Sequence, residues 1–478
     1  MQWQLPSGKQ AAYLKLISLI SQSIENGDLL PGDHLPPERE LSLQLGINRS
    51  TIQHAFNELV SRGILVRKVG SGTWVNSGKW GVLSQGVNWQ SYMTTGRLGD
   101  PENFMIRLRN LEHEKDVINL AHSSIDTDLS LPVDLTDMTA RDLVTQEAST
   151  AISGALDLKH QLSKHLSPFL HQSIPASQIL ITSGAQQAFY LITQGLLSYG
   201  DAIAIEEPSY FYQLSLFQAA GIRVFGIPLK ENGGLDLDVL EQLYYKHHLR
   251  FLFVNPTGQN PTTETMPLKD RQELIERCQQ LNLPIVEDDP LGLTNAIMND
   301  QVTTLKQLDP SNVLYIGSFS SLSGESTRIG WLIAPPAIVN RLAEIRQQME
   351  AGISIFPQLV SSQLLKQNNL TELVDRQMRL LKKSKQRLLT ALKPLVDREL
   401  VDYRLPTHSN NIWLSLNSNQ KFTSSDYNTF LDEKLLVRPD FLFGVHVNHV
   451  RISFTQIKAA QVEELQARME RVVLKMLK

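Results

Sequence analysis

The sequence predicts an α/β protein in two parts: a small helical unit with a β-hairpin, followed by a larger domain with a mostly parallel sheet covered by helices. Three observations support this fold class. The chain has 478 residues, which is too long for a single hydrophobic core. Apolar residues recur at helical spacing near the N-terminus. From about residue 116 onward, short β-prone runs alternate with helix-length segments, as in parallel sheets.

The composition is that of an ordinary globular protein. Hydrophobic residues make up 42% and charged residues 20% of the chain, and the formal net charge is −4. Any contact with nucleic acid must therefore come from a local patch. The single cysteine, Cys278, excludes a disulfide within the chain. Because the N-terminus has no apolar signal core and no stretch approaches the length of a membrane span, we expect a cytoplasmic protein, and we expect no metal site.

Residues 1–76 are predicted to form three helices and a hairpin. Apolar residues at helical spacing predict the first helix. The second spans about 38–45 and stops at Gly46, after which Asn48 can cap the third. The segment 64–75 contains two β-prone runs around Gly-Ser-Gly, which predicts a hairpin that projects as a wing.

Residues 77–115 differ from both of their neighbours. The segment is polar, contains glycine and lacks sustained periodicity. We therefore expect an inter-domain linker that has room for short helical pieces.

Residues 116–478 carry the candidate strands. Helix-length segments separate most of them, which favours a largely parallel sheet covered by helices, and the chain ends in a smaller mixed α/β piece. The candidate strands are 179–182, 202–206, 224–227, 251–254, 285–287, 313–317 and 331–334.

The third helix of the N-terminal unit carries side chains suited to reading DNA. When such a helix enters a major groove, its first residues face the base edges. Arginine can bind guanine and glutamine can bind adenine through paired hydrogen bonds, hydroxyl groups and other cations suit phosphates, and a hairpin glycine allows close approach. The candidate DNA-binding residues are Arg39, Arg49, Ser50, Thr51, Gln53, Arg67, Lys68 and Gly70.

The segment 35–75 resembles the GntR family of winged helix–turn–helix regulators. The motifs L-P-x-E-R-E-L, L-G-[IV]-x-R-x-T and G-x-G-T-x-V all occur in register. The resemblance implies a domain that binds double-stranded DNA. One departure is Pro37, where the family commonly has a serine that caps the second helix. Since proline tolerates a helix start, we expect little damage.

The segment from about residue 116 to 478 resembles fold-type I pyridoxal 5'-phosphate (PLP) enzymes of the aminotransferase class. A GntR unit joined to such a body is the arrangement of the MocR subfamily of regulators. In this resemblance, Asp288 matches the carboxylate that keeps the ring nitrogen protonated, and Asn260 the partner of the ring hydroxyl. Tyr210 matches the aromatic residue on the ring face, and Arg451 the arginine that grips a substrate carboxylate. The residues that match the family's phosphate ligands are Gly184, Ala185, Gln186, Ser318, Ser320 and Arg328.

The catalytic lysine of the family has no match. Seven residues before the phosphate arginine the chain has Ser321, and no lysine occurs between Lys306 and Lys366. Serine can neither form a stable imine nor shuttle a proton as a basic amine. We therefore expect no aminotransferase activity, no catalytic residue and no covalent PLP. Because the other ligands are retained, non-covalent binding remains possible. The ligand could be PLP or a derivative whose aldehyde group has already reacted, such as pyridoxamine phosphate or a PLP–amino acid adduct.

Three functions stay open on the sequence alone. The first is a homodimeric DNA-binding transcription regulator whose large domain senses a PLP-related or amino-acid ligand. The second is a PLP-dependent aminotransferase with an accessory DNA-binding domain, against which Ser321 argues. The third is a regulator whose large domain is only a dimer scaffold. Leu291 and Ser149, which stand where the family has tyrosines, favour the scaffold, whereas Asp288 and Arg451 argue against it.

Overall fold

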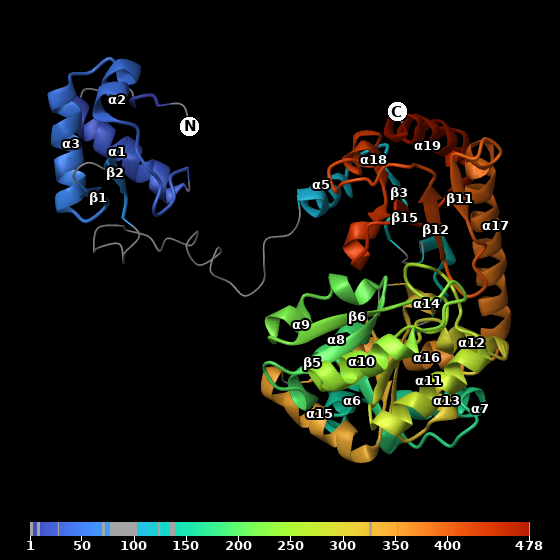
Figure 1. The fold of residues 1–478 in the computed structure, drawn as a ribbon. Helices are drawn as coiled ribbons and strands as arrows, with labels where there is room; N and C mark the ends of the chain where they lie inside the picture. Colours follow the sequence, from blue (N-terminus) through green and yellow to red (C-terminus); the bar gives the residue numbers. More distant parts are fainter. Residues whose placement is uncertain are drawn as a thin grey trace. The chain divides into compact units, whose positions relative to one another are not determined.

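The structure is a computed structural model that divides into two compact units, residues 1–100 and 101–478 (Figure 1). It describes residues 3–6, 10–26, 28–68, 72–76, 103–122, 125, 127–133, 139–324, 327–350 and 352–477. Most of the expected linker 77–115 therefore lies outside the described residues. Its last part forms helix α5 (Asn103–Leu111), and this helix buries Phe104 in a core of the second unit.

The N-terminal unit has a core of three helices and a two-stranded hairpin. Helix α1 spans Ala12–Glu25, α2 spans Glu38–Leu45 and α3 spans Arg49–Ser61. Strands β1 (Leu65–Lys68) and β2 (Gly72–Val75) pair antiparallel. The apolar faces of the helices and the hairpin form one buried cluster. The expected helical trio and hairpin are thus both present.

The ends of α2 and α3 follow the signals read from the sequence, with one exception. Gly46 ends α2 in the left-handed conformation, with φ of 64°, which costs glycine little. Asn48 stands at the N-terminal cap of α3, but its side chain makes no capping hydrogen bond. Pro37 stands at the N-terminal cap of α2, so a proline is accommodated there.

The large unit contains a seven-stranded sheet with the order β4-β10-β9-β8-β7-β5-β6. Only β10 (Gly330–Ile333) runs antiparallel to its neighbours, so the sheet is mostly parallel. All seven candidate segments form strands of this sheet. The other six strands are β4 (Ile179–Thr182), β5 (Ala202–Glu207), β6 (Arg223–Pro228), β7 (Leu249–Val254), β8 (Ile285–Asp288) and β9 (Val313–Ser318).

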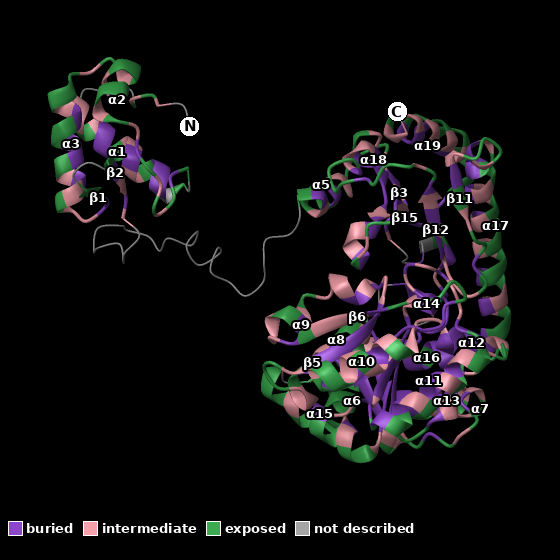
Figure 2. Ribbon diagram, viewed as in Figure 1, coloured by how far each residue is buried: buried purple, intermediate pink, exposed green. Residues whose placement is uncertain are grey.

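Helices cover both faces of this sheet, and its strands other than the edge strand β6 are almost wholly buried between them (Figure 2). Alternate residues of a strand point to opposite faces. Leu314 therefore packs with helices α8 and α15, whereas Tyr315 packs with α7, α12 and α16. The covering helices include α7 (Leu156–Phe169), α8 (Ala185–Leu196), α10 (Leu237–His247), α11 (Leu268–Leu281), α12 (Gly292–Met298), α15 (Pro336–Met349) and α16 (Ile355–Lys366).

A smaller α/β subdomain is formed mainly by the C-terminal part of the chain. Its four-stranded sheet has the order β11-β12-β15-β14. The long helix α17 (Leu370–Val396) and the final helix α19 (Val462–Met476) pack against it in one apolar cluster. Among the described helices, none is both long and apolar enough to cross a membrane. The strands are β11 (Val401–Tyr403), β12 (Asn411–Leu416), β14 (Arg438–Pro439) and β15 (His449–Ser453).

Candidate functional sites

The side chains expected to contact DNA surround one hollow of about 640 Å³ on the N-terminal unit. Side chains of α2, α3 and the hairpin line it together. Ser50 and Thr51 lie in the first turn of α3 but do not line this hollow, and Gly70 lies outside the described residues. The expected residues that do line the hollow are Arg39, Arg49, Gln53, Arg67 and Lys68.

Glu38 holds two of these arginines by a single carboxylate. Its Oε2 lies 3.3 Å from Arg49 Nε, and its Oε1 lies 2.6 Å from Arg67 Nη2. Arg67 also donates to Asn57 Oδ1 at 3.1 Å. Glu38 belongs to the sequence motif, but the motif does not indicate that Glu38 binds both arginines. Its pair with Arg67 joins residues 29 positions apart, which a local pattern cannot predict.

The expected cofactor residues gather at the carboxyl ends of the parallel strands, where ligands bind in open α/β sheets. Asp288 is the last residue of β8 and Ser318 the last of β9. Tyr210 follows β5, and Asn260 lies in the loop after β7. Tyr210 N donates to the Asn260 carbonyl at 3.0 Å, so these two loops are joined.

A buried carboxylate lies at the centre of this group. Asp288 is 5% exposed, and it accepts a hydrogen bond of 2.7 Å from the hydroxyl of Tyr210. Burial raises the pKa of Asp288 to about 7, although the Tyr210 hydrogen bond opposes this rise. The protein itself therefore supplies the donor that Asp288 requires.

Arg451, on β15 of the smaller subdomain, reaches the same group of residues. Its Nη1 donates to Asn260 Oδ1 at 3.0 Å, and its Nη2 donates to the carbonyl of Ala121. Its Nε is buried and has no hydrogen-bond partner among the described residues. A buried guanidinium with a spare donor suits an anionic ligand.

The expected phosphate turn lies between β4 and the N-terminus of α8. Gly184 has φ of 80°, and β10 passes so close that a Cβ on Gly330 would lie 2.6 Å from the Gly184 carbonyl carbon. Ser318 Oγ and Ser320 Oγ share a hydrogen bond of 2.7 Å. Arg328 is exposed, and Ala185 and Gln186 open α8, where backbone N–H groups favour anions.

Ser321 lines a cavity of about 140 Å³ together with Asn260 and Leu291. Its Oγ accepts a hydrogen bond of 2.9 Å from Thr294 Oγ1. No lysine contributes to the described lining of this cavity. Ser149, by contrast, is exposed at the end of α6 (Ala140–Ser149), where its hydroxyl bonds to carbonyls of its own helix.

Two further residues, Asn255 and Glu206, hold the loops of the site in place, and the sequence did not predict them. Asn255 Nδ2 donates to the Asp288 carbonyl at 2.8 Å, and its Oδ1 accepts from Asn260 N at 2.8 Å. Its own N–H donates to Glu206 at 3.0 Å. Burial raises the pKa of Glu206 to about 8. Asn255 and Glu206 each follow or end a predicted strand, in the segments "VNP" and "IEEP", and this position could have marked them as site residues. The sequence alone does not indicate that the two residues contact one another.

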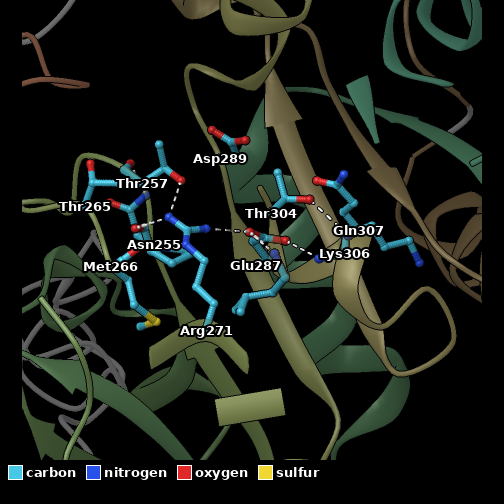
Figure 3. A network of polar contacts seen from close by, with 12 residues as sticks. Asn255, Thr257, Thr265, Met266, Arg271, Glu287, Asp289, Thr304, Lys306 and Gln307 are labelled. Atoms are coloured by element: carbon cyan, nitrogen blue, oxygen red, sulfur yellow. Dashed lines mark hydrogen bonds and ion pairs between the residues drawn. The ribbon is translucent and has the colours of Figure 1, made fainter. Parts of the chain in front are cut away.

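Figure 3 shows a second buried network around Glu287, which precedes Asp288 in β8. Arg271 donates to Thr257 Oγ1 at 2.9 Å and lies 3.8 Å from Glu287, which in turn accepts backbone N–H bonds from Leu305 and Lys306. Burial raises the pKa of Glu287 to about 7. The network fixes β8 and therefore the position of Asp288. The described residues contain no cluster of three or more side chains that could hold a metal ion.

A larger hollow of about 680 Å³ lies elsewhere on the second unit. It is lined by segments that include Leu229–Glu231 and 402–404, together with Trp413 and His449. None of the expected site residues lines it. The chemistry argued above therefore belongs to the residues around Asp288 and to the smaller cavity that Asn260 and Ser321 line.

Two family models match the chain. Residues 115–469 match aminotransferase class I and II, and residues 12–75 match the bacterial regulatory proteins of the gntR family. The two matched segments fall in the two compact units.

Relatives and solved structures agree with this division. The chain is 27% identical to the HTH-type transcriptional regulator YdfD of Bacillus subtilis over 466 residues, which cover 96% of this chain and 95% of the relative. It is 24% identical to the HTH-type transcriptional regulator NorG of Staphylococcus aureus, with coverages of 88% and 95%. A multiple substrate aminotransferase from Thermococcus profundus shares the fold with a TM-score of 0.69 at 22% identity, covering 82% of this chain and 99% of that one.

Proposed function

The chain belongs to the aminotransferase class I and II family and carries a gntR-family domain, and from this premise we propose that it is a DNA-binding transcription regulator whose large domain binds a small molecule. One observation carries the proposal. The arginines of α3 and the hairpin meet in one hollow, next to the residues that would enter a major groove. Relatives named as transcriptional regulators match both units.

In this proposal α3 reads the bases. Arg49 and Gln53 lie one turn apart at the start of the helix, where a recognition helix faces the groove. Arg39 and Lys68 also line the same hollow and would contact phosphates. Glu38 would release Arg49 and Arg67 when DNA phosphates or bases take its place.

The donor set of the large unit fits PLP or a derivative of it. Asp288 would hold the ring nitrogen, Asn260 the ring hydroxyl, and the free Nε of Arg451 a carboxylate. PLP supplies an electron-withdrawing ring and a reactive aldehyde when it is bound. The phosphate would meet the first turn of α8 with Ser318, Ser320 and Arg328.

We also propose that Ser321 occupies the position of the Schiff-base lysine, so the large domain is not an enzyme. Ser321 lies in the cavity beside Asn260, at the correct distance in sequence from Arg328. Lys306, the preceding lysine in the sequence, is buried and donates to carbonyls of Pro310 and Val313. Val313 begins β9, whereas Ser321 follows its far end. This lysine therefore serves the structure rather than the cleft.

Two observations favour other functions. Several solved structures with this fold are named as aminotransferases, which favours the enzyme. Tyr210 bonds to Asp288 and Arg451 bonds to Asn260, so these polar groups have partners without a ligand. This favours a scaffold that binds no small molecule. The spare donor of Arg451 argues for the sensor over the scaffold.

We further propose a homodimer that binds paired half-sites, because the symmetry of an operator mirrors that of a two-fold protein. Light scattering on the full chain at micromolar concentration should give the dimer mass. A monomer would contradict this part of the proposal.

The central experiment selects DNA from a random library with the purified full chain and then measures affinity for the selected sequence. We expect a sequence preference that changes when pyridoxamine phosphate is added, and no conversion of amino donors in the presence of PLP. If the protein showed no sequence preference, the proposal of a sequence-specific regulator would be contradicted. An affinity that is the same with and without pyridoxamine phosphate and PLP would favour the scaffold.

A further inference from the structure

Two arginines lie side by side on the four-stranded sheet of the smaller subdomain. Arg438 on β14 and Arg451 on β15 are directly opposed in the antiparallel register. Opposed residues of an antiparallel pair project from the same face of the sheet. The face that presents Arg451 to Asn260 therefore also carries Arg438.

Neither guanidinium makes an ion pair with a carboxylate of the described residues. No carboxylate among the described residues lies within ion-pair distance of Arg438 or Arg451, and the Nε atoms of both are buried without a hydrogen-bond partner. Arg438 makes one weak contact, from its Nη1 to Met105 Sδ at 3.5 Å. Glu112 acts on Arg438 through its charge, but His122 contacts this carboxylate at 2.7 Å.

Such a pair is costly in the absence of an anion. Buried charges in proteins are normally paired, and two adjacent cations repel one another. Burial and, to a lesser extent, the charge of Arg438 lower the pKa of Arg451 to about 9. Burial lowers the pKa of Arg438 as well. The strand pair therefore holds two positive charges whose best partners would come from a ligand.

We propose that the ligand of the large unit is dianionic at its amino-acid end, as in a dicarboxylic amino acid or its adduct with PLP. Arg451 would take the carboxylate nearer the ring, and Arg438 would take the second. Each guanidinium has one unused Nε, and a carboxylate bonds best to a guanidinium edge that includes it. This inference rests on the proposed sensor function, and it adds Arg438 as the residue that determines specificity.

The test compares two ligands of the same shape and different charge. Calorimetry on the full chain should measure the affinity of N-(5'-phosphopyridoxyl)-L-glutamate and of N-(5'-phosphopyridoxyl)-L-glutamine. We expect the glutamate derivative to bind about tenfold more tightly or better, because it alone offers a charged second group. The Arg438→Met variant keeps a long apolar side chain, and we expect it to lose this preference while binding the glutamine derivative as the wild type does.

Arg109→Met is the matched control. Arg109 is an exposed cation on α5 that acts on Arg438 only through its charge, so the variant should keep the preference for glutamate. Should Arg438→Met not fold, Arg438→Lys keeps the charge without the forked geometry and should reduce the preference.

The outcomes separate the two proposals. Equal affinity of the wild type for both derivatives would overturn the dianionic ligand and leave the sensor intact. An equal loss of preference in Arg438→Met and Arg109→Met would show a diffuse charge effect and would also overturn it. If neither derivative binds, the sensor function fails, and this inference fails with it.

Discussion

The hydroxyl of Tyr210 donates a hydrogen bond of 2.7 Å to the carboxylate of Asp288, 78 residues further along the chain. Asp288 is buried, so without this donor its charge would be unsatisfied. We expect a ring nitrogen that binds Asp288 to compete with the phenol for Oδ2, the oxygen that Tyr210 occupies. If the two donors compete, the measured affinity of a ligand is the difference between two hydrogen bonds to the same carboxylate.

Tyr210→Phe should raise the affinity for pyridoxamine phosphate and lower the stability of the ligand-free protein. The substitution keeps the aromatic ring but leaves Asp288 without its donor, which costs about 1–3 kcal/mol for a buried group. Calorimetry gives the affinity and thermal unfolding gives the stability. Tyr212→Phe is the control, since the Tyr212 hydroxyl donates to a different carboxylate, Glu207, at 2.5 Å. Equal affinities in wild type and Tyr210→Phe would show that the two donors do not compete.

The buried carboxyl groups predict a pH dependence of stability. Burial raises the pKa of Glu206 to about 8, whereas an unfolded glutamate titrates near its ordinary value of about 4. A raised pKa in the folded state gives stability that is complete below the unfolded pKa and is lost as pH rises through the folded pKa. Between about pH 5 and pH 8, the free energy of unfolding of the wild type should therefore fall relative to that of Glu206→Gln.

Denaturant titrations at several pH values measure this difference. One group contributes a slope of at most about 1.4 kcal/mol per pH unit. Glu463→Gln, at an exposed position in the first turn of α19, should run parallel to the wild type. Parallel curves for Glu206→Gln and the wild type would show that Glu206 does not titrate in this window.

Much of this arrangement could be predicted from the sequence, because it depends on local patterns. The run ILIT at 179–182 and the glycine after it predicted β4 and the turn before α8, and both are present. The spacing from Ser321 to Arg328 predicted that this serine stands at the lysine position; Ser321 lines a cavity together with Asn260, and the match to the lysine stays a prediction. A short periodic segment carries its own signal for strand or helix, so its position needs no knowledge of distant residues.

The partners within each site could not be predicted, because they come from distant parts of the chain. Glu38 binds Arg67 across 29 positions, and Arg438 meets Arg451 only through the register of two strands. The sequence also gave no indication that Tyr210, expected on the ring face, bonds to Asp288 in the absence of a ligand. Such contacts depend on the tertiary fold, which brings residues together regardless of their spacing.

Arg49→Ala should weaken binding to the selected operator by about 1–3 kcal/mol, the usual contribution of a paired contact to guanine. Fluorescence anisotropy against the selected and a scrambled sequence measures the change. Arg62→Ala is the control, because Arg62 lies just after the last turn of α3, bound to Glu58 at 2.8 Å and outside the hollow. An Arg49→Ala protein with wild-type operator affinity would show that this end of α3 does not enter the groove.

Wild-type protein mixed with PLP should form no Schiff base at position 321. Serine has no amine, and no lysine contributes to the described lining of the cavity around Ser321. We expect no visible absorbance band that survives dialysis, and no adduct at this position after borohydride reduction and peptide mass analysis. A stable yellow complex would mean that another lysine reaches the cleft, and the assignment as a non-enzyme would then be wrong.

Ser321→Lys should restore at best weak covalent binding. The new amine would enter a cavity of about 140 Å³ at a position that is 7% exposed, where burial disfavours its charged form and favours the nucleophilic amine. Leu291 would still offer no hydroxyl group to the cofactor's surroundings. Adding Leu291→Tyr should therefore increase the fraction of protein that borohydride fixes, whereas Leu291→Phe, which adds the ring without the hydroxyl, should not. Full covalent occupancy by Ser321→Lys alone would show that the lysine is the only function the cleft has lost, and it would strengthen the case for a former enzyme whose remaining residues are intact.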